Sequence, residues 1–440
     1  MGVKAGIATR VITPEAGVKL FGYPRFKRVG ESISDPLLVS ALHLRSGASG
    51  IILVSLDLFW VDTPTARSIR SRISEAVSMT EQHLFVACTN NHSGPSMAQP
   101  ICWMGDYRVP KPDEAYVEKV AFESVEAAGA AAATTMPSEV GWTQCTASIA
   151  GGNLSPDGPA EMSADLLVVR LIDSKKVVGI AAVCDLRPGV LDEQSMQVSS
   201  DYPSHTRRLL KEHFGDDCLL VQFTAPSGDQ GTPLAAGGTG AEEAERIGRL
   251  FSESIIAAIE AMGQDEFTSD PVLSGSRTSI VPTRRTLPGL WDAQLAWGDR
   301  KAELQRLQQE GAPENQVRAA LRGVVETDGL VYMVRSVDAG AIDGMLEPYG
   351  RVDVQVMRAA GKCIAGMPGV LYRAYGDKIR EATGGKAVPA SLANGELQGC
   401  IVTPEAAAAG DYSSLNSPFA PEVGDKLVDA VLSIVPDDLK

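Results

Sequence analysis

The amino-acid sequence predicts an α/β protein, in the mixed α+β sense, with a large mixed sheet covered by helices. Apolar, β-branched runs of strand length alternate with amphipathic helical segments along most of the chain. Several strand-like runs end in polar loops rich in Gly, Pro, Asn and Asp, as strands of a buried sheet do. The chain has 440 residues, 44% of them hydrophobic and 22% charged, as in ordinary globular proteins.

The first third of the chain predicts a β-α-β unit. Residues 37–44 and 51–58 are apolar runs joined by a glycine-containing turn, which is typical of a β-hairpin. We interpret Asp57, near the end of the second run, as a buried carboxylate with hydrogen-bond partners. A helix with Thr63 as its N-cap is expected next, and an apolar strand over residues 84–88 follows it.

The rest of the chain continues this alternation and is interpreted as part of one large domain, residues 1–440. The segment 264–280 is polar and marks the place where a subdivision would fall. A charged segment, 298–323, is interpreted as a solvated pair of helices broken near Gly311. Further strands are expected at about 139–147, 165–172, 177–184, 219–223, 352–357 and 363–367, and further helices at about 113–133, 204–215, 239–262 and 424–435.

Composition and charge argue against several classes of function. The net charge of −15 at pH 7 disfavours nucleic acid and anionic membrane surfaces as partners, because both attract Lys and Arg. The sequence has no apolar run long enough for a transmembrane helix, and its N-terminus lacks the apolar core of a signal peptide. The seven scattered cysteines are expected to be free thiols in a reducing cytoplasm. We therefore expect a cytoplasmic protein that binds a small molecule, as a monomer or a homo-oligomer.

The segment 84–95 is the first candidate for a functional site. Its apolar strand runs into a loop that contains Asn90, Asn91, His92 and Ser93. A rigid strand that ends in an open polar loop is where α/β proteins place their chemistry. A loop in which the asparagines only cap a turn and His92 is satisfied locally is an equally good interpretation of the local sequence.

A second polar loop follows the strand-like run 219–223. It contains Ser227, Asp229, Gln230 and Thr232 between glycines and prolines, which makes it tight. Backbone amides in such a loop could form an oxyanion hole.

The segment 199–205 precedes a helix that Ser204 is expected to cap. Asp201 and His205 are its titratable groups. A helix N-terminus disfavours protonated His, so His205 is expected to be neutral and able to accept a proton, unless it only lies on the surface. The segment 96–112, rich in Met, Pro, Trp and Tyr, could form a lid or substrate wall, or a packed surface loop.

The His92 loop resembles the His-Thr-His-Ser-Gly-Pro signature of the neutral, non-lysosomal ceramidases and their bacterial relatives. Other stretches match that family in the same order and together span nearly the whole chain: 8–14, 21–23, 34–37, 53–57, 200–203, 228–230, 367–369 and 417–421. The resemblance implies the mixed-sheet core of the ceramidase N-terminal domain. It does not point to ceramide as the substrate, and we expect no counterpart of the C-terminal immunoglobulin-like domain of the ceramidases.

The same resemblance implies that the zinc site of the family has been lost. Ceramidases hold zinc with two histidines, a glutamate and a tyrosine. The corresponding positions in this chain are Asn90, Arg187, Val370 and Cys400. Because zinc needs three or four N, O or S ligands, we expect no metal cofactor.

A relocated metal site is the alternative to metal loss. His92 and His205, with Asp201 or Asp229, are the obvious ligands among the few histidines of the chain. Without a metal, Arg187 would supply a fixed positive charge that can grip a carboxylate or an oxyanion but cannot activate water.

We predict a pocket for a small anionic or polyhydroxylated substrate, with His92 as general acid/base oriented by Asp229 or Asp201. The ceramidase nucleophile is a serine two residues after the aspartate of a Gly-Asp turn. That position lacks a hydroxyl in this chain, so the adjacent Thr232 is the candidate nucleophile, and His205 is a second candidate base. The side chains expected to bind substrate oxygens are Tyr23, Asn90, Asn91, Ser93, Arg187, Asp201, Ser227 and Gln230.

These residues predict a metal-independent hydrolase of a small amide, ester or lactone that uses Thr232 or an activated water. A lyase or isomerase, which only transfers protons beside an anchored anion, would use the same groups. The third interpretation is a pseudoenzyme that binds a ligand without converting it.

Overall fold

The structure is a computed structural model that describes residues 2–23, 26–151, 159–230 and 240–440. Its core is layered: helices pack on one face of a large sheet, and a smaller sheet packs on the other face. Further helices cover the outer face of the smaller sheet. The prediction of an α/β fold built on a large mixed sheet is confirmed.

The large sheet is mixed, with parallel pairs near both ends of its strand order. Strands β8 and β10 are parallel, as are β4 and β5, and the neighbouring pairs between them are antiparallel. The strand β11 (Phe267–Thr268) pairs with β6 off this order. In spatial order the strands are β10 (Leu219–Thr224), β8 (Val177–Cys184), β7 (Glu161–Leu171), β6 (Met136–Ser148), β1 (Lys4–Val11), β3 (Leu38–Ser46), β4 (Ser49–Leu56) and β5 (Leu84–Cys88).

The predicted hairpin and β-α-β unit are both present. Strands β3 and β4 pair in antiparallel register, and β4 continues through the helix α1 (Thr63–Val77) to its parallel partner β5. The prediction of Thr63 as N-cap is wrong, because the side chain of Asp62 accepts the Thr65 amide at 2.9 Å instead. A carboxylate one residue earlier competes well for the free amides of the first turn.

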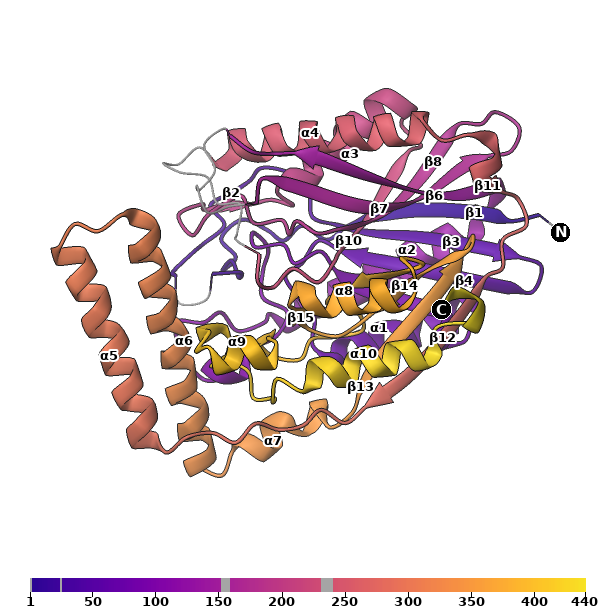
Figure 1. Cartoon of the computed structure of the whole chain (residues 1–440). Coiled ribbons are helices and arrows are strands. Elements are labelled where there is room, and N and C mark those ends of the chain that lie inside the picture. Colours follow the sequence, from indigo (N-terminus) through magenta and orange to yellow (C-terminus); the bar gives the residue numbers. More distant parts are fainter. Residues whose placement is uncertain (1, 24–25, 152–158, 231–239) are drawn as a thin grey trace.

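Four helices cover one face of the large sheet. The helices α1 and α2 pack against the half that contains β3 to β5, and α3 and α4 pack against the half that contains β6 to β8. Figure 1 shows α3 and α4 side by side along the upper edge of the molecule. Within the described residues, no helix is long and apolar enough to cross a membrane. The bounds of the last three are α2 (Glu114–Ala133), α3 (Tyr202–Phe214) and α4 (Gly240–Glu260).

The smaller sheet packs its inner face against the large one. Phe85 and Phe223 of the large sheet meet the apolar side chains of Met357, Ile364 and Val388 in one buried cluster. The outer face is covered by the helices α8 and α10. The antiparallel pair expected at 352–357 and 363–367 is therefore confirmed. The elements are β12 (Ser274–Ile280), β13 (Val352–Ala359), β14 (Lys362–Gly366), β16 (Ala387–Ala390), α8 (Arg373–Ala382) and α10 (Val423–Ile434).

The segment 264–280 carries the chain from one sheet to the other. Its first strand, β11, pairs with the large sheet, and its last, β12, pairs with the smaller sheet. Organisation of residues 1–440 as one domain stays a prediction. The remaining short elements are β2 (Ser32–Ile33), β9 (Gln197–Val198), β15 (Val370–Leu371), β17 (Cys400–Ile401), α7 (Ile342–Leu346) and α9 (Pro404–Ala408), with single 3₁₀ turns at Glu81–His83, Ile101–Trp103, Gln264–Glu266, Glu347–Tyr349, Tyr412–Ser414 and Asp437–Leu439.

A helical hairpin, α5 (Leu290–Gln309) and α6 (Glu314–Asp338), stands at one side of the sheets in Figure 1. The sequence predicted a solvated pair, and α5 is indeed mostly exposed. The part of α6 inside the predicted segment, residues 314–322, is also exposed or half-buried, and the buried part of α6 begins where that segment ends, from Gly323 to Val334. Gly329 lies against Cys102 and Trp103 of the 96–112 loop, so the loop and the helix form one packed wall.

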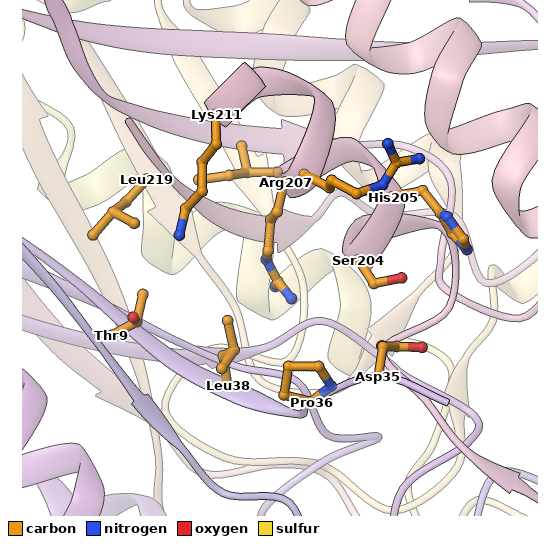
Figure 2. A pocket seen from close by; sticks show the side chains of 11 residues that line it. Thr9, Asp35, Pro36, Leu38, Ser204, His205, Arg207, Lys211 and Leu219 are labelled. Carbon is orange, nitrogen blue, oxygen red and sulfur yellow. The ribbon is translucent and has the colours of Figure 1, made fainter. Parts of the chain in front are cut away.

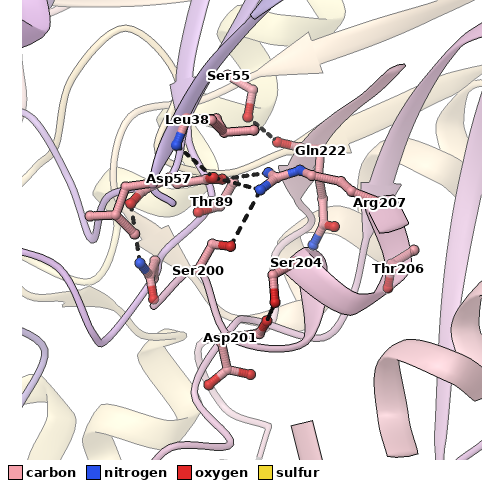
Figure 3. Close-up of polar contacts among 12 residues, drawn as sticks. Leu38, Ser55, Asp57, Thr89, Ser200, Asp201, Ser204, Thr206, Arg207 and Gln222 are labelled. Atoms are coloured by element: carbon pink, nitrogen blue, oxygen red, sulfur yellow. Dashed lines mark hydrogen bonds and ion pairs between the residues drawn. The ribbon is translucent and has the colours of Figure 1, made fainter. Parts of the chain in front are cut away.

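A buried ion pair joins α3 to the end of β4. Two terminal nitrogens of Arg207 donate to the carboxylate oxygens of Asp57 at 2.6 Å and 2.7 Å (Figure 3). Burial alone would lower the pKa of Arg207, but the adjoining Asp57 carboxylate raises it above its ordinary value. The Leu38 amide also donates to Asp57, at 3.0 Å. The predicted role of Asp57 as a buried carboxylate with hydrogen-bond partners is confirmed.

The same ion pair supports the His92 loop. The side-chain amide of Asn91 donates to the Asp57 carbonyl at 3.1 Å and to the Ser199 carbonyl at 2.9 Å. Arg207 also donates to the hydroxyl of Ser200, at 3.4 Å. The end of β4, the start of α3 and the loop after β5 are therefore held by one polar network.

We expect Asp57→Ala to lower the free energy of unfolding by about 3–5 kcal/mol, because it leaves the Arg207 guanidinium buried and unpaired. Urea unfolding followed by circular dichroism measures this change. Arg249→Ala, which removes an exposed ion pair with Glu253 on α4, is the control and should change stability little. Equal effects of the two substitutions would contradict this role for the buried pair.

Candidate functional site

Polar loops meet where β5, β8 and β10 end. The hydroxyl of Thr224, at the end of β10, donates to the Thr89 carbonyl at 2.6 Å. The amide of His92 donates to the Pro188 carbonyl at 3.1 Å, which joins the β5 loop to the β8 loop. The loops that the sequence singled out therefore converge. They do so although β5 and β10 stand at opposite ends of the strand order, because β10 also contacts β4 and β5 directly.

Arg187 joins the β8 loop to the β10 loop. One of its terminal nitrogens donates to the carbonyls of Ser227, at 3.4 Å, and Gln230, at 3.2 Å. Burial lowers the pKa of Arg187 from its ordinary value. A guanidinium still keeps its proton in a protein, so Arg187 places a fixed positive charge between these loops.

The imidazole of His92 lies between two aromatic rings. Its centroid is 4.8 Å from that of Phe59 and 5.0 Å from that of Tyr23, both in edge contacts. Nδ1 is enclosed and has no hydrogen-bond partner among the described residues. Burial lowers the pKa of His92 well below its ordinary value, and the charges of Arg187 and Arg28 lower it further. The ring is therefore neutral at pH 7 and can accept a proton.

Arg28 holds the His92 loop in place through hydrogen bonds. It is 2% exposed, and its nitrogens donate to the His92 carbonyl at 2.7 Å and to the Ser93 hydroxyl at 3.3 Å. Its guanidinium carbon also lies 5.0 Å from the centroid of the Tyr23 ring. No local pattern signals this residue, because it lies in an irregular polar segment far from His92 along the chain.

The segment Phe21–Tyr23 lies directly against His92. The Phe21 amide donates to the Gly94 carbonyl at 2.8 Å. A Cβ atom at Gly22 would lie 2.5 Å from the Cα of His92, so only glycine allows this approach. The Tyr23 hydroxyl donates to the carbonyls of Gly189 and Leu191, and burial raises its pKa. Tyr23 therefore lines the site with its ring while its hydroxyl is bonded to the backbone.

The residues at the four positions that correspond to zinc ligands lie in the same region of the site. Val370 and Cys400 are directly paired in the short parallel strands β15 and β17. The charge of Arg187 acts on Cys400 as well as on His92. Asn90 has a left-handed backbone, φ 62°, which Asn tolerates, and its side-chain oxygen is buried without a partner among the described residues.

This set of side chains does not fit zinc. Val370 offers no donor atom and Arg187 is a cation. Burial raises the pKa of the Cys400 thiol to about 12, which keeps it protonated at pH 7. Within the described parts of the chain, no group of three His, Cys, Asp or Glu side chains could hold a metal ion.

The alternative ligand set of His92, His205, Asp201 and Asp229 is not brought together. The Asp201 carboxylate accepts the amides of Leu191 and Tyr202, at 2.9 Å and 2.7 Å, and caps α3. Asp229 is exposed and accepts the amide of Arg373, the first residue of α8, at 2.8 Å. His205 lines a different cavity on α3 (Figure 2).

These positions also correct the predicted roles of two carboxylates. No hydrogen bond joins Asp201 or Asp229 to His92 in the described residues, because both carboxylates are used at helix starts. The prediction of Ser204 as the cap of α3 is wrong for the same reason, since Asp201 occupies that position. Burial raises the pKa of Asp201 to about 6, and burial lowers that of His205.

Most other predicted contacts to substrate are bonded within the loops. The side-chain oxygen of Asn91 accepts the Ser93 amide at 3.0 Å, and the Ser227 hydroxyl donates to the Ala225 carbonyl at 3.1 Å. Gln230 contributes its carbonyl to Arg187. These residues build the site and hold Arg187. The predicted nucleophile, Thr232, lies outside the described residues.

Glu326 is a candidate that the sequence did not reveal. It lies on α6, and its Oε2 is enclosed without a partner among the described residues. Burial raises its pKa to about 8, Arg322 opposes this rise, and Asp411 adds to it. Its charge raises the pKa of Cys400, which indicates that it lies near that thiol. Glu326 follows the charged segment 298–323, and no periodicity or motif distinguished it.

All seven cysteines are free thiols, as predicted, and all but Cys400 are buried. Cys400 is partly accessible and lies in the candidate site. The thiols of Cys88, Cys184 and Cys218, which follow or end apolar runs, belong to the core.

Comparisons with known proteins agree with this architecture. No family model and no curated protein matches the sequence. The fold matches the crystal structure of neutral ceramidase from Pseudomonas aeruginosa, with a TM-score of 0.70 and 15% identity over 100% of this chain and 77% of the other. It also matches a ceramidase structure in complex with C2, with a TM-score of 0.72 and 13% identity over 100% and 78%. At this identity the likeness establishes the fold and leaves the activity to the site: the chain has the neutral ceramidase fold.

Proposed function

We propose that this protein is a hydrolase of a small anionic amide, ester or lactone, and that Arg187 takes the electrostatic role at the position of the family's metal. The observation that supports the proposal most is that a fixed cation, Arg187, and a neutral base, His92, lie in one site. Arg187 lies among the former ligand positions, and its charge together with burial keeps His92 unprotonated.

The positive potential at His92 defines the substrate class. Two guanidinium groups, Arg187 and Arg28, act on the imidazole. Glu326, whose charge acts on Cys400, is protonated below a pH of about 8. An anionic substrate group lowers the electrostatic energy of such a site. An anionic transition state is stabilised in the same way, because a pre-positioned cation needs no rearrangement as charge develops.

Each step of hydrolysis has a group to perform it. The neutral imidazole of His92 takes a proton from water or from a hydroxyl such as that of Thr232, and the resulting oxygen nucleophile adds to the substrate carbonyl carbon. Arg187 stabilises the oxyanion. Glu326 donates its proton to the leaving nitrogen or oxygen as the bond to carbon breaks. The proton on His92 then passes to Glu326 through solvent, which restores both groups. If Thr232 is the nucleophile, a water molecule deprotonated by His92 then hydrolyses the acyl ester, and Glu326 returns a proton to the Thr232 oxygen.

A lyase or an isomerase would use the same neutral base beside the same cation. A panel of small amides, esters, lactones and 2-hydroxy or 2-amino acids separates these reactions by their products. Ligand binding without conversion of any compound would indicate a binding protein.

Arg187→Met should lower kcat/KM by about 10²–10³-fold, the usual effect of removing one group that stabilises an oxyanion. Arg187→Lys should keep part of the rate, because the charge remains and the bidentate geometry is lost. Steady-state kinetics on the most active compound of the panel measures both. Arg249→Met on the exposed face of α4 is the matched control. Unchanged affinity and turnover in Arg187→Met would overturn the proposal.

The raised pKa of Glu326 predicts the alkaline limb of the pH–rate profile. The rate should fall as the pH rises through about 8, because the carboxyl then loses the proton it donates. Glu326→Gln should lower the rate and remove this limb. Glu314→Gln, at the exposed start of α6, should leave the profile unchanged. An identical limb in Glu326→Gln would contradict the role of Glu326.

Protein stability gives an independent readout for Glu326. Folding raises its pKa from 4.5 to about 8, so the folded state holds a proton that the unfolded state releases. The contribution of Glu326 to the free energy of unfolding is therefore largest below pH 4.5 and declines as the pH rises toward 8. In thermal unfolding, Glu326→Gln should remove this decline, whereas Glu314→Gln should keep it.

A further inference from the structure

A second cavity, of about 410 Å³, opens between α3 and the strands β1, β3 and β10 (Figure 2). His92, Arg187 and Cys400 are not among its lining residues, so it is separate from the candidate site. Its volume falls in the range of sites for small organic ligands.

The walls of this cavity are mainly apolar. Leu38 of β3 and Leu219 and Leu220 of β10 line it, together with the methylene stems of Arg207 and Lys211. Figure 2 shows Arg207 and Lys211 extending from α3 toward Leu38 and Thr9 on the opposite wall. A ligand that fills this space needs an apolar body to match the walls.

Two cationic side chains that line this cavity each have a nitrogen without a hydrogen-bond or ion-pair partner among the described residues. The terminal nitrogens of Arg207 are bonded to Asp57, but its Nε is enclosed with no hydrogen-bond partner among the described residues, and the residue is 9% exposed. Lys211 lies one helical turn further on. Its ammonium makes no hydrogen bond or ion pair with any residue that the structure describes. A buried N–H without an acceptor is unfavourable, and an anionic ligand would supply one.

The other charges at the cavity already have partners. Arg208 donates to Glu212 and Glu245, at 2.9 Å and 3.4 Å. The Asp35 carboxylate accepts the amide and hydroxyl of Ser200, each at 2.7 Å. Asp35 lies at the far end of the cavity from Lys211 in Figure 2, so the charge to be matched at the Lys211 end is positive.

We propose that this cavity is a binding site for a small organic carboxylate with an apolar body. One carboxylate oxygen accepts the N–H of Arg207 Nε, and the Lys211 ammonium forms the ion pair. The apolar body lies between Leu38 on one wall and Leu219 and Leu220 on the other. This site does not rest on the hydrolase proposal, because neither His92 nor Arg187 lines it. The two sites are linked through Arg207, whose ion pair with Asp57 supports the His92 loop.

The charge requirement is tested by isothermal titration calorimetry of the whole protein with cyclohexanecarboxylate and with cyclohexylammonium. We expect saturable binding of one equivalent of the carboxylate and none of the cation, which has the same apolar ring. Lys211→Met keeps the apolar stem and should weaken carboxylate binding at least tenfold. Lys4→Met, at an exposed position of β1, should bind like the wild type.

The location is tested with a pair of substitutions at Thr9, which lines the wall opposite α3. Thr9→Phe should fill the cavity and abolish binding, whereas Thr9→Val keeps its volume and should preserve binding. This pair decides the question even if Lys211→Met does not fold. The proposal is overturned if the wild type binds no carboxylate, if cyclohexylammonium binds equally well, or if Thr9→Phe leaves binding unchanged.

Discussion

The candidate site depends on the buried ion pair between Asp57 and Arg207. Removing two charges from water is costly, and a buried pair is tolerated only where further hydrogen bonds complete its geometry. Here the bonds come from the Leu38 amide and the Ser200 hydroxyl, so the end of β4 and the start of α3 are fixed relative to each other. Asn91 then ties the next loop to the Asp57 carbonyl, which sets the place of His92.

The protonation states of the groups around Arg187 are consistent with its single positive charge. A zinc site balances a divalent cation against anionic ligands, whereas Arg187 brings a single positive charge. The neighbouring groups follow this smaller charge: Val370 is apolar, Cys400 remains a thiol, His92 is neutral, and Glu326 is protonated below a pH of about 8. Each of these neutral states avoids the cost of placing a further charge in an enclosed space.

Much of the fold could be predicted because it depends on short-range patterns. The periodicity of apolar residues located the β3–β4 hairpin, the strand β5 and the helix α2 within a few residues. The convergence of positions 90, 187, 370 and 400 could not come from periodicity. It came from the resemblance to the ceramidases, and the pairing of β15 with β17 then gave it a geometric basis.

The failures have specific physical causes. Thr63 and Ser204 are good capping residues, but Asp62 and Asp201 lie close by and their carboxylates are stronger acceptors for the free amides. Arg28 reaches His92 only through tertiary folding, and no local pattern signals such a contact. The burial of Glu326 could not be predicted from the sequence. It depends on how α6 packs against the 96–112 loop and the C-terminal segment near Tyr412–Ser414.

The central claim is that a guanidinium has replaced the metal, and zinc binding tests it most directly. The purified protein would be incubated with excess zinc and desalted, and its metal content would be measured by plasma mass spectrometry. We expect far less than one equivalent per chain and the same rate before and after chelation, because Val370 and Arg187 offer no ligand. One tightly held equivalent that disappears, together with the activity, in Cys400→Ala would contradict the claim.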